Sequence, residues 1–471
     1  MTGAPSSSDV PRPPDAPSPS NTVPPSNSAP PSGTPLSFPA RVAELAGQGR
    51  LVVQPRMGFG TLDAMGAGLR AVAGARADVV GTLTLDSYTR VGDHTAADLA
   101  LRDGHDLNGF PIVVHGPGDT RAMIDTAVAG RIPVQVRHGS AEPLKIFEAL
   151  LDAGLDATEG GPVSYCLPYS RVPLAAAVDA WAECCELLAR GPGDGRPGHL
   201  ESFAGCMLGQ LCPPSLLVAL NILEGLFFRQ YGIRSMSLSY AQQIHPGQDR
   251  EAILALRRLA AELLTGMDTH VVVYTFMGLF PATAEGAAAI SRDSVELAVR
   301  SGAERLIVKT AVEAHRIPTV AENVAALELA AGHAAATAAR TGPSDLYPVP
   351  APAPVPYDLD SETYTEARLL IDAVRSLDGD IGRALVRAFR TGLLDVPYCL
   401  HPDNAGLTRT TISPEGRLAW ARTGHLPLPQ PPGAQDADAG GSAQLLRMLS
   451  HNQRRYDAAP TDPVRKALVT A

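Results

Sequence analysis

Short apolar runs rich in β-branched residues alternate with longer segments of helical periodicity from about residue 51 to residue 309. Such alternation is typical of βα units whose strands form a parallel sheet. The expected fold class is α/β, with a TIM-type (β/α)8 barrel as the architecture. A barrel has eight strand positions, so one of nine candidate runs is an extra strand or a loop, and periodicity alone does not say which. The nine runs are Leu51–Gln54, Val79–Leu85, Phe110–His115, Pro133–Arg137, Asp156–Glu159, Leu200–Phe203, Ser235–Tyr240, His270–Thr275 and Arg305–Lys309.

A polar or reactive side chain stands at or just beyond the carboxyl end of nearly every run. In a (β/α)8 barrel these ends meet around one mouth, so the pattern predicts a pocket holding three guanidiniums, two carboxylates and an ammonium. An ordinary polar loop residue explains any one of these positions taken singly, but it explains the recurrence of arginine poorly. The side chains are, in order, Arg56, Arg90, His115, Arg137 with His138, Glu159, Glu201, Tyr240, Met277 and Lys309.

The charges of this pocket predict a small acidic ligand. Three arginines in one cavity leave buried positive charge uncompensated unless an anion neutralises it. The ligand is therefore expected to carry at least one carboxylate, and two would each find a guanidinium fork. Glu159 stands on the glycine-rich turn Thr158–Tyr165, which allows close backbone approach and suits an ammonium group. A dicarboxylic amino acid matches this set of charges.

Motifs of other chemistries are missing or incomplete. The sequence contains no Gly-x-Ser-x-Gly elbow, no His-Glu-x-x-His pair and no P-loop, so hydrolysis, zinc chemistry and phosphoryl transfer lose support. Residues 66–71 imitate a dinucleotide-binding fingerprint, but their glycines fall inside a helical pattern. Residues 103–109 nearly spell the cobalt-coordinating motif Asp-x-His-x-x-Gly, yet the glycine is one residue late and the segment precedes a candidate strand. A surface loop is the better interpretation there, and we assign no metal ligands.

The composition excludes several classes of partner. The net charge is −10 and no Lys/Arg cluster is dense, which argues against nucleic acid or anionic lipid. No run reaches the roughly 20 apolar residues of a membrane-spanning helix, so no membrane span is expected. The six cysteines form no CxxC pair and the N-terminus lacks an apolar signal-peptide run, so we expect a cytoplasmic location.

Proline-rich stretches divide the chain into four expected parts. Residues 1–37 consist mostly of Pro, Ser, Ala and Asn, a composition that predicts a disordered tail. Residues 38–342 form the expected catalytic barrel. Alternating prolines predict a linker over residues 343–357. Residues 358–471 form a mostly helical C-terminal extension, with a helical part at Glu362–Leu394 and a short helix near the end.

Seven sequence blocks occur in the order of a known family. The chain resembles the large (epsilon) chain of adenosylcobalamin-dependent glutamate mutase, also called methylaspartate mutase, from about Leu51 to Pro427. The ordered set is highly specific, unlike any single block. The blocks are Gln54-Pro-Arg-Met-Gly-Phe59, Thr84-Leu-Asp-Ser-Tyr-Thr-Arg90, Leu107-Asn-Gly-Phe-Pro111, Gln135-Val-Arg-His-Gly139, Glu159-Gly-Gly-Pro-Val-Ser-Tyr-Cys-Leu-Pro-Tyr169, Met277-Gly-Leu-Phe-Pro281 and Val308-Lys-Thr-Ala-Val-Glu-Ala-His-Arg-Ile-Pro-Thr319.

The resemblance implies an enzyme that interconverts L-glutamate and (2S,3S)-3-methylaspartate by a radical rearrangement of the carbon skeleton. Its implied cofactor is adenosylcobalamin, held mainly by a separate small chain that carries Asp-x-His-x-x-Gly. The implied assembly is a heterotetramer containing a homodimer of this chain, and the chain alone is expected to be inactive. Since the cofactor supplies the radical chemistry, the absence of a protein nucleophile agrees with this implication.

The resemblance also assigns residues. Three arginines are similar to a claw on the two substrate carboxylates, and Glu159 is similar to the carboxylate that holds the substrate ammonium. The implied substrate contacts are Arg56, Arg90, Arg137, His138, Glu159, Tyr165 and Tyr169. Catalytic roles are implied for Glu159, Arg90, Arg137 and Tyr169. The implied cofactor contacts are Gly58, Asn108, Pro168, Phe280, Lys309, Glu313 and Ile317.

Lysine is rare in this chain, which has only Lys145, Lys309 and Lys466 among its 39 lysines and arginines. A lysine at 309 is therefore an unusual choice, and it supports the implied pairing of Lys309 with Glu313 on the adenosyl ribose. The spacing of four residues places both side chains on one side if a helical turn follows the strand. A solvated lysine at a strand end stays open as the alternative.

The chain departs from the family pattern at three places. Pro162 replaces a glycine, Cys166 replaces an asparagine, and the aromatic segment before Met277 is reduced to Tyr274-Thr-Phe276. These changes alter the shape beside Glu159 and on the cofactor face. Two alternatives therefore stay open: a diverged barrel that acts on or binds another acidic amino acid, and a silent assembly partner of a cobalamin protein.

Overall fold

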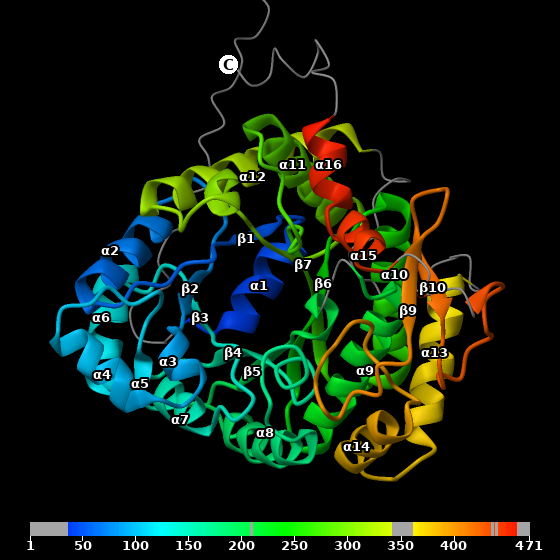
Figure 1. Cartoon of the computed structure of the whole chain (residues 1–471). Coiled ribbons are helices and arrows are strands. Elements are labelled where there is room, and N and C mark those ends of the chain that lie inside the picture. The colour runs from blue at the N-terminus through cyan, green and yellow to red at the C-terminus, as the bar shows by residue number, and fades with distance from the viewer. Residues whose placement is uncertain (1–35, 208–210, 342–360, 435–437, 439–440, 459–471) are drawn as a thin grey trace, which may run out of the picture.

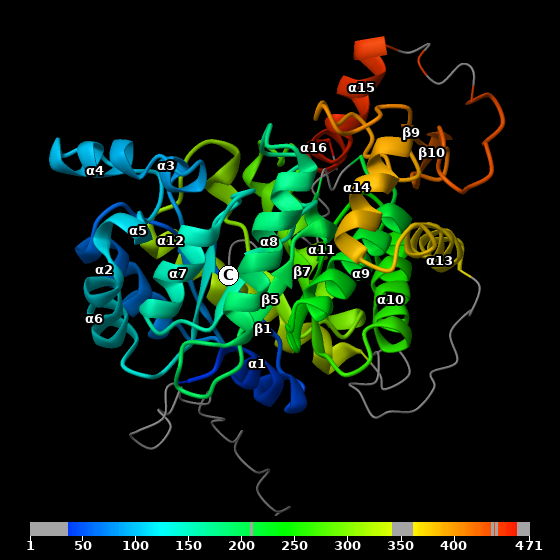
Figure 2. The same cartoon turned by 90° about the horizontal axis from the view of Figure 1, so that it is seen from below.

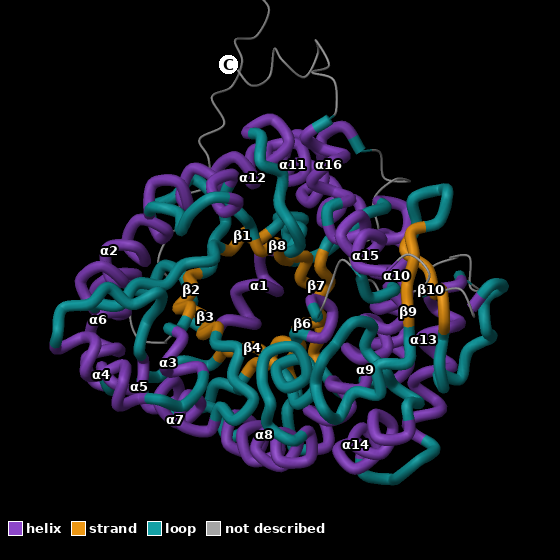
Figure 3. The backbone as a smooth tube through the Cα atoms, viewed as in Figure 1, coloured by secondary structure: helices purple, strands orange, loops and turns teal. Residues whose placement is uncertain are grey.

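Eight parallel strands form one sheet in the computed structural model, which describes residues 36–207, 211–341, 361–434, 438 and 441–458. Their spatial order is β1-β8-β7-β6-β5-β4-β3-β2, and a bridge from Val53 to Val79, just before β2, closes the ring. Figure 3 shows this ring of strands inside a ring of helices. The predicted (β/α)8 barrel is confirmed. Its strands are β1 (Val52–Gln54), β2 (Gly81–Thr84), β3 (Val134–Arg137), β4 (Ala157–Gly160), β5 (His199–Ser202), β6 (Ser235–Ala241), β7 (Asp268–Tyr274) and β8 (Arg305–Ile307).

One of the nine candidate strands is wrong. In the run Phe110–His115, the residues from Ile112 to His115 form the short helix α5. Pro111 lies inside this run and has no backbone N–H to give to a sheet, so the segment cannot serve as a central strand. His115 consequently stands away from the mouth, and its Nε2 lies 2.8 Å from the carbonyl oxygen of Gly60. Each of the other eight runs overlaps one barrel strand.

Helices cover the outside of the barrel, and α1 (Phe38–Gly47) closes its N-terminal end. The backbone N–H of Phe38 donates to Asp156 at 3.1 Å, and the Phe38 ring lies 5.0 Å below the Arg305 guanidinium. Figure 2 shows α1 at the end opposite to α3 and α4, so the strand carboxyl ends open on the other side. The outer helices are α2 (Leu62–Ala73), α3 (Ser87–Arg90), α4 (His94–Arg102), α6 (Pro117–Val128), α7 (Leu144–Asp152), α8 (Leu174–Ala189), α9 (Pro214–Gln230), α10 (Pro246–Leu263), α11 (Ala284–Arg300) and α12 (Val320–Arg340), with short 3-10 turns at Ala204–Cys206 and Ala311–Ala314.

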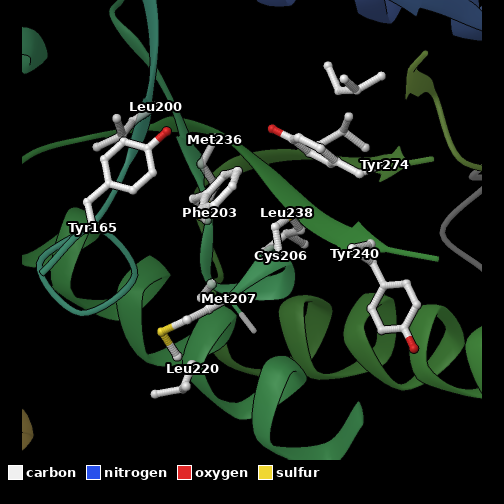
Figure 4. Close-up of a cluster of buried hydrophobic side chains, with 14 of the residues drawn as sticks. Tyr165, Leu200, Phe203, Cys206, Met207, Leu220, Met236, Leu238, Tyr240 and Tyr274 are labelled. Atoms are coloured by element: carbon white, nitrogen blue, oxygen red, sulfur yellow. The ribbon is translucent and has the colours of Figure 1, made fainter. Parts of the chain in front are cut away.

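The core combines apolar packing with a buried ion pair inside the barrel. Figure 4 shows part of the apolar core, where Leu220 of α9 lies next to Met207. Arg305 and Glu201 pair in the barrel interior, and both side chains are fully buried. Glu201 was expected at the mouth, and this expectation is wrong because its partner on β8 holds it below the mouth.

The C-terminal part is mostly helical, as predicted, and packs against α9 and α10 (Figure 1). Its helices are α13 (Glu362–Arg375), α14 (Ile381–Thr391), α15 (Gly441–Leu449) and α16 (His451–Asp457). A hairpin of β9 (Arg409–Ile412) and β10 (Leu418–Arg422) was not predicted. The predicted tail and linker fall almost entirely outside the described residues, and the four-part division of the chain stays a prediction. Within the described ranges, no helix is long and apolar enough to cross a membrane.

Candidate functional site

A cavity of about 630 Å³ opens at the carboxyl ends of the strands. All seven residues predicted to contact substrate line it, together with two of the predicted cofactor residues, Glu313 and Ile317. These residues, predicted from the sequence, thus lie around one cavity. The lining consists of Arg56, Thr84, Arg90, Arg137, His138, Gly139, Glu159, Tyr165, Tyr169, Phe203, Met277 and residues 313–318.

The three arginines reach this cavity from three neighbouring parts of the barrel. Arg137 is the last residue of β3, and Arg56 follows β1 by two residues. Arg90 ends α3, which begins because the Asp86 carboxylate accepts the backbone N–H groups of Tyr88 and Thr89 at 2.9 and 3.0 Å. Asp86 thus turns the chain after β2 and directs Arg90 back toward the mouth.

Arg137 and Glu159 form a buried pair at the floor of the cavity. The Arg137 Nε donates to Glu159 at 2.7 Å, while its terminal nitrogen Nη2 donates to the Tyr274 hydroxyl at 3.2 Å. Tyr165 donates to the second Glu159 oxygen. Burial raises the pKa of Tyr165, which keeps its hydroxyl protonated as a donor. Glu159 is therefore held in one orientation by groups from β3, β7 and its own turn.

Arg90 is different, because its guanidinium has no hydrogen-bond or ion-pair partner in the described part of the chain. Gly139 makes room for it: a Cβ at Gly139 would lie 3.0 Å from an Arg90 nitrogen. Gly139 also has a positive φ of 78°, which L side chains rarely adopt. A side chain at position 139 would therefore push against the Arg90 guanidinium.

His138 lines the same cavity as a neutral imidazole. Its Nδ1 accepts the backbone N–H of Ser140 at 3.0 Å, so its proton lies on Nε2. That Nε2 is buried beside the backbone of Glu159. Burial, and next the positive charge of Arg90, lower the pKa of His138 to about 3. Stacked on Trp181 at 5.9 Å, the imidazole is fixed as an uncharged N–H donor.

The glycine-rich turn after β4 is shaped from below by Glu224. The Glu224 carboxylate accepts the backbone N–H groups of Val163 and Ser164 at 3.1 and 2.9 Å and the hydroxyls of Ser164 and Ser202. A Cβ at Gly161 would lie 2.2 Å from this carboxylate, so only glycine fits there. Burial raises the pKa of Glu224 to about 7. Sequence reasoning did not find Glu224, which lies in the middle of an apolar helix.

The C-terminal part braces the outer side of the same turn. His401 Nε2 lies 2.9 Å from the Val172 carbonyl oxygen and 3.7 Å from the Cys166 sulfur. Burial raises the pKa of the Cys166 thiol to about 11. Cys166, one of the departures from the family pattern, therefore packs away from the cavity. Its role in the structure is to hold the turn that carries Tyr165 and Tyr169.

A second charged cluster lies on the β8 side of the mouth. Arg56 donates to Glu313 at 3.0 Å, and the other Glu313 oxygen accepts the backbone N–H of Thr310 at 3.0 Å. Lys309 is buried, its ammonium lies 4.3 Å from the Phe280 ring centre, and it has no ion-pair partner in the described residues. Burial, partly offset by Glu313, lowers the pKa of Lys309 to about 8. Glu313 thus links a claw arginine to the expected ribose site.

The remaining predicted cofactor residues do not line this cavity. Gly58 packs against the β2 end, where a Cβ would lie 2.1 Å from the Thr84 carbonyl oxygen. Asn108 accepts the backbone N–H of Ser87 at 3.0 Å. Pro168 is half-buried in the turn before Tyr169. Phe280 lies under Lys309, so the structure leaves these residues around the cavity rather than in it.

Sequence reasoning missed Tyr274 as a site residue. Its hydroxyl contacts Glu159 at 3.1 Å and also donates to Glu201, so it connects the cavity with the buried Arg305 pair. Its position as the last residue of β7 was the available signal. Tyr240, expected at the mouth, instead donates to Asp249 at 2.9 Å and lies outside the cavity. Among the described residues no cluster of His, Cys, Asp and Glu is suited to a metal ion.

Comparison with known proteins identifies relatives over most of this length. Residues 35–438 match the family model described as methylaspartate mutase E chain (MutE). The glutamate mutase epsilon subunit of Escherichia coli O157:H7 is 31% identical over 81% of this chain and 79% of its own. That of Haloarcula marismortui is 32% identical over 83% and 79%. A solved structure of a sialic acid synthetase from Leptospira borgpetersenii aligns with a TM-score of 0.36 and 12% sequence identity. The alignment covers 64% of this chain and 87% of that one.

Proposed function

This chain belongs to the family of methylaspartate mutase E chains and is an isomerase of the glutamate mutase type, and we propose that it interconverts L-glutamate and (2S,3S)-3-methylaspartate. In this proposal it forms the barrel chain of an assembly whose cobalamin lies on a separate small subunit. The seven residues of the mouth act on the substrate, and the cluster on the β8 side acts on the cofactor.

The charge balance of the cavity supports this substrate most directly. Arg137 is neutralised by Glu159 and Arg56 by Glu313, while Arg90 has no partner among the described residues. The three arginines and two carboxylates therefore leave one positive charge. Glutamate and 3-methylaspartate each carry two carboxylates and one ammonium, so their single net negative charge balances it. A neutral amino acid would leave the Arg90 charge uncompensated.

Each group has a distinct task in this arrangement. Arg90 grips one substrate carboxylate with its free guanidinium, and His138 lines the cavity near it as an uncharged imidazole. Arg137 keeps its Nε on Glu159 and offers its remaining nitrogens to the other carboxylate. Glu159 holds the substrate ammonium and takes up or returns its proton. Tyr165 and Tyr169 cover the substrate and exclude water, which protects a reactive intermediate from side reactions.

The residues on the β8 side fit an adenosyl ribose. Its hydroxyl groups need both a donor and an acceptor, and Lys309 and Glu313 provide one of each. Lys309 in particular is a buried ammonium with no ion-pair partner in the described part of the chain, so it lacks an acceptor that a bound ligand would supply. Adenosylcobalamin, when bound, supplies the radical that removes a hydrogen atom from substrate. The protein's part is to position the substrate and keep water out.

The rim of the mouth suits a partner chain. Apolar side chains are exposed on the loops after β2, β4, β7 and β8, including Val91, Leu279 and Ile317, with 77%, 49% and 69% of their surface exposed. Isolated exposed apolar residues are common, but several around one opening are typical of an interaction surface. The relatives are named as epsilon subunits, which implies an assembly of different chains. We assign this rim to the small cobalamin-binding subunit, within a heterotetramer that contains two copies of this chain.

Reconstitution tests the proposal. The chain is mixed with a small Asp-x-His-x-x-Gly subunit and adenosylcobalamin, and ¹³C-labelled L-glutamate is followed by NMR. The expected product is 3-methylaspartate, formed only when both chains and the cofactor are present. Turnover by this chain alone would contradict the two-chain assignment. Turnover of another acidic amino acid in place of glutamate would favour the diverged-barrel alternative, and no turnover with an intact assembly would favour a silent partner.

A further inference from the structure

The loop from Thr275 to Thr283, between β7 and α11, carries two residues of the mouth but has no regular secondary structure of its own. Met277 lines the cavity, and Phe280 lies under the Lys309 ammonium. Backbone N–H groups in such a loop need partners from elsewhere. Near its start, the Phe276 N–H donates to the Gln242 side chain at 3.1 Å.

At its far end the loop is held by α16. The Asp457 carboxylate accepts the backbone N–H groups of Ala282 and Thr283, each at 3.0 Å, and the Thr283 hydroxyl at 2.7 Å. Figure 1 shows α16 lying beside α11, whose first turn follows Thr283 directly. Because Asp457 is negatively charged and lies at the N-terminus of α11, the helix dipole favours it there.

Contacts from three of its residues fix α16 itself on the same face of the barrel. The Tyr456 hydroxyl donates to Asp293 at 2.5 Å, and the Tyr456 ring packs against the cluster that contains Phe276 and Phe280. Asn452 donates to the Gln243 carbonyl at 2.9 Å, and Arg455 donates to the Ile244 carbonyl at 2.9 Å. The helix therefore joins the loop after β6 to the loop after β7.

The contact continues to the cofactor side of the mouth. The Ala282 carbonyl lies 3.2 Å from His315 Nε2. His315 lines the cavity two residues after Glu313. The Ala282 N–H thus donates to Asp457 while its carbonyl oxygen contacts His315. Ala282 therefore connects α16 with the turn that carries Glu313.

We propose that α16 positions the β7–α11 loop for cofactor binding, with Asp457 as the positioning residue. The proposal rests on the proposed function, because it takes the cluster of Phe280, Lys309 and Glu313 as the cofactor side. α16 lies beyond residues 35–438, which match the family model. Asp457 does not line the cavity, so it acts through Ala282 and Thr283.

Asp457→Ala and the milder Asp457→Asn test this in the full chain. Arg454→Ala is the matched control, because Arg454 lies on the same helix but its side chain bonds only to the Ser450 and Arg447 carbonyls. The first measurement is hydrogen exchange of the loop residues in the chain alone. The second compares the apparent affinities of adenosylcobalamin and L-glutamate in the assembly with the small subunit.

We expect faster exchange at Ala282 and Thr283 and a several-fold weaker adenosylcobalamin affinity in Asp457→Ala, with glutamate affinity kept and Arg454→Ala unchanged. Faster exchange with normal cofactor affinity would overturn the proposal, because Asp457 would then only cap α11. An equal loss of both affinities would also overturn it, since α16 would then support the fold as a whole. If the assembly containing the unsubstituted chain does not bind adenosylcobalamin, the proposed function is refuted instead. The hydrogen-exchange rates at Ala282 and Thr283 would still show whether Asp457 holds the loop.

Discussion

Replacing Lys309 by methionine should stabilise the cofactor-free chain while weakening its cofactor site. The Lys309 ammonium is buried, and burial lowers its pKa from 10.5 to about 8. The difference of about 2.5 pH units corresponds to about 3 kcal/mol of folding free energy at neutral pH. Contact with the Phe280 ring offsets roughly 0.5–2 kcal/mol of this cost. The net gain expected for Lys309→Met, which keeps the length and packing of the side chain, is about 1–3 kcal/mol.

The pH dependence gives this prediction its sign. In the folded chain Lys309 loses its proton near pH 8, whereas in the unfolded chain it does so near pH 10.5. The stability that Lys309→Met gains over the parent chain is therefore largest below pH 8. This gain declines as the pH rises and disappears near pH 10.5. Urea unfolding of the cofactor-free chain at pH 7 and pH 9.5 measures it.

Lys145→Met is the matched control for this experiment. Lys145 is exposed and pairs with Glu148 at 2.8 Å on the surface of α7, so its replacement should change stability little. Adenosylcobalamin affinity of the assembly should fall in Lys309→Met and not in Lys145→Met. A Lys309→Met chain less stable than the parent at pH 7 would refute the reasoning, because Lys309 would then contribute to the fold rather than await a ligand.

The other predictions concern the claw, a close backbone approach and the glycine-rich turn. Arg90→Lys keeps the charge but loses the bidentate grip, so kcat/KM should fall by roughly 10- to 150-fold, as for the loss of about 1.5–3 kcal/mol, and near-normal steady-state kinetics would remove Arg90 from the claw. Gly58→Ala should lower thermal stability because its Cβ would lie 2.1 Å from the Thr84 carbonyl oxygen, whereas Gly47→Ala, with open space around it, should be tolerated in the same melting experiment. The raised pKa of Glu224, about 7, makes its ionised form costly in the fold, so the free energy of unfolding should fall by about 3 kcal/mol between pH 4.5 and pH 7. Glu224→Gln should abolish this fall. Urea unfolding measures it, and an unchanged pH dependence in the variant would refute the reasoning.

The barrel was predictable from sequence because its signal is local. A strand and a helix differ in the periodicity of neighbouring residues, and eight of the nine candidate runs overlap strands. The error at Phe110–His115 came from weighing its β-branched residues above Pro111, which removes a backbone donor. The hairpin of β9 and β10 was missed because it is short and bonds through Leu418 to Gln248, a partner 170 residues away.

The site was predictable to the extent that strand ends converge. That rule places Arg56, Arg137 and Glu159 together without any knowledge of their partners. It cannot say which carboxylate neutralises which arginine, and the pair of Arg56 with Glu313 joins residues 257 positions apart. Glu224 could not be predicted for the same reason. Its partners are backbone N–H groups of a turn about 60 residues earlier in the chain.

The affinity of the assembled protein for L-glutamate relative to L-glutamine tests the central claim most directly. The two amino acids have nearly the same shape, but glutamine carries an uncharged amide where glutamate has its side-chain carboxylate. If Arg90 awaits a carboxylate, calorimetric titration should show glutamate binding roughly 10- to 150-fold more tightly, the ratio for a charge-assisted hydrogen bond of about 1.5–3 kcal/mol. Equal affinities for the two amino acids would contradict the account, because the cavity would then not recognise a dicarboxylic substrate.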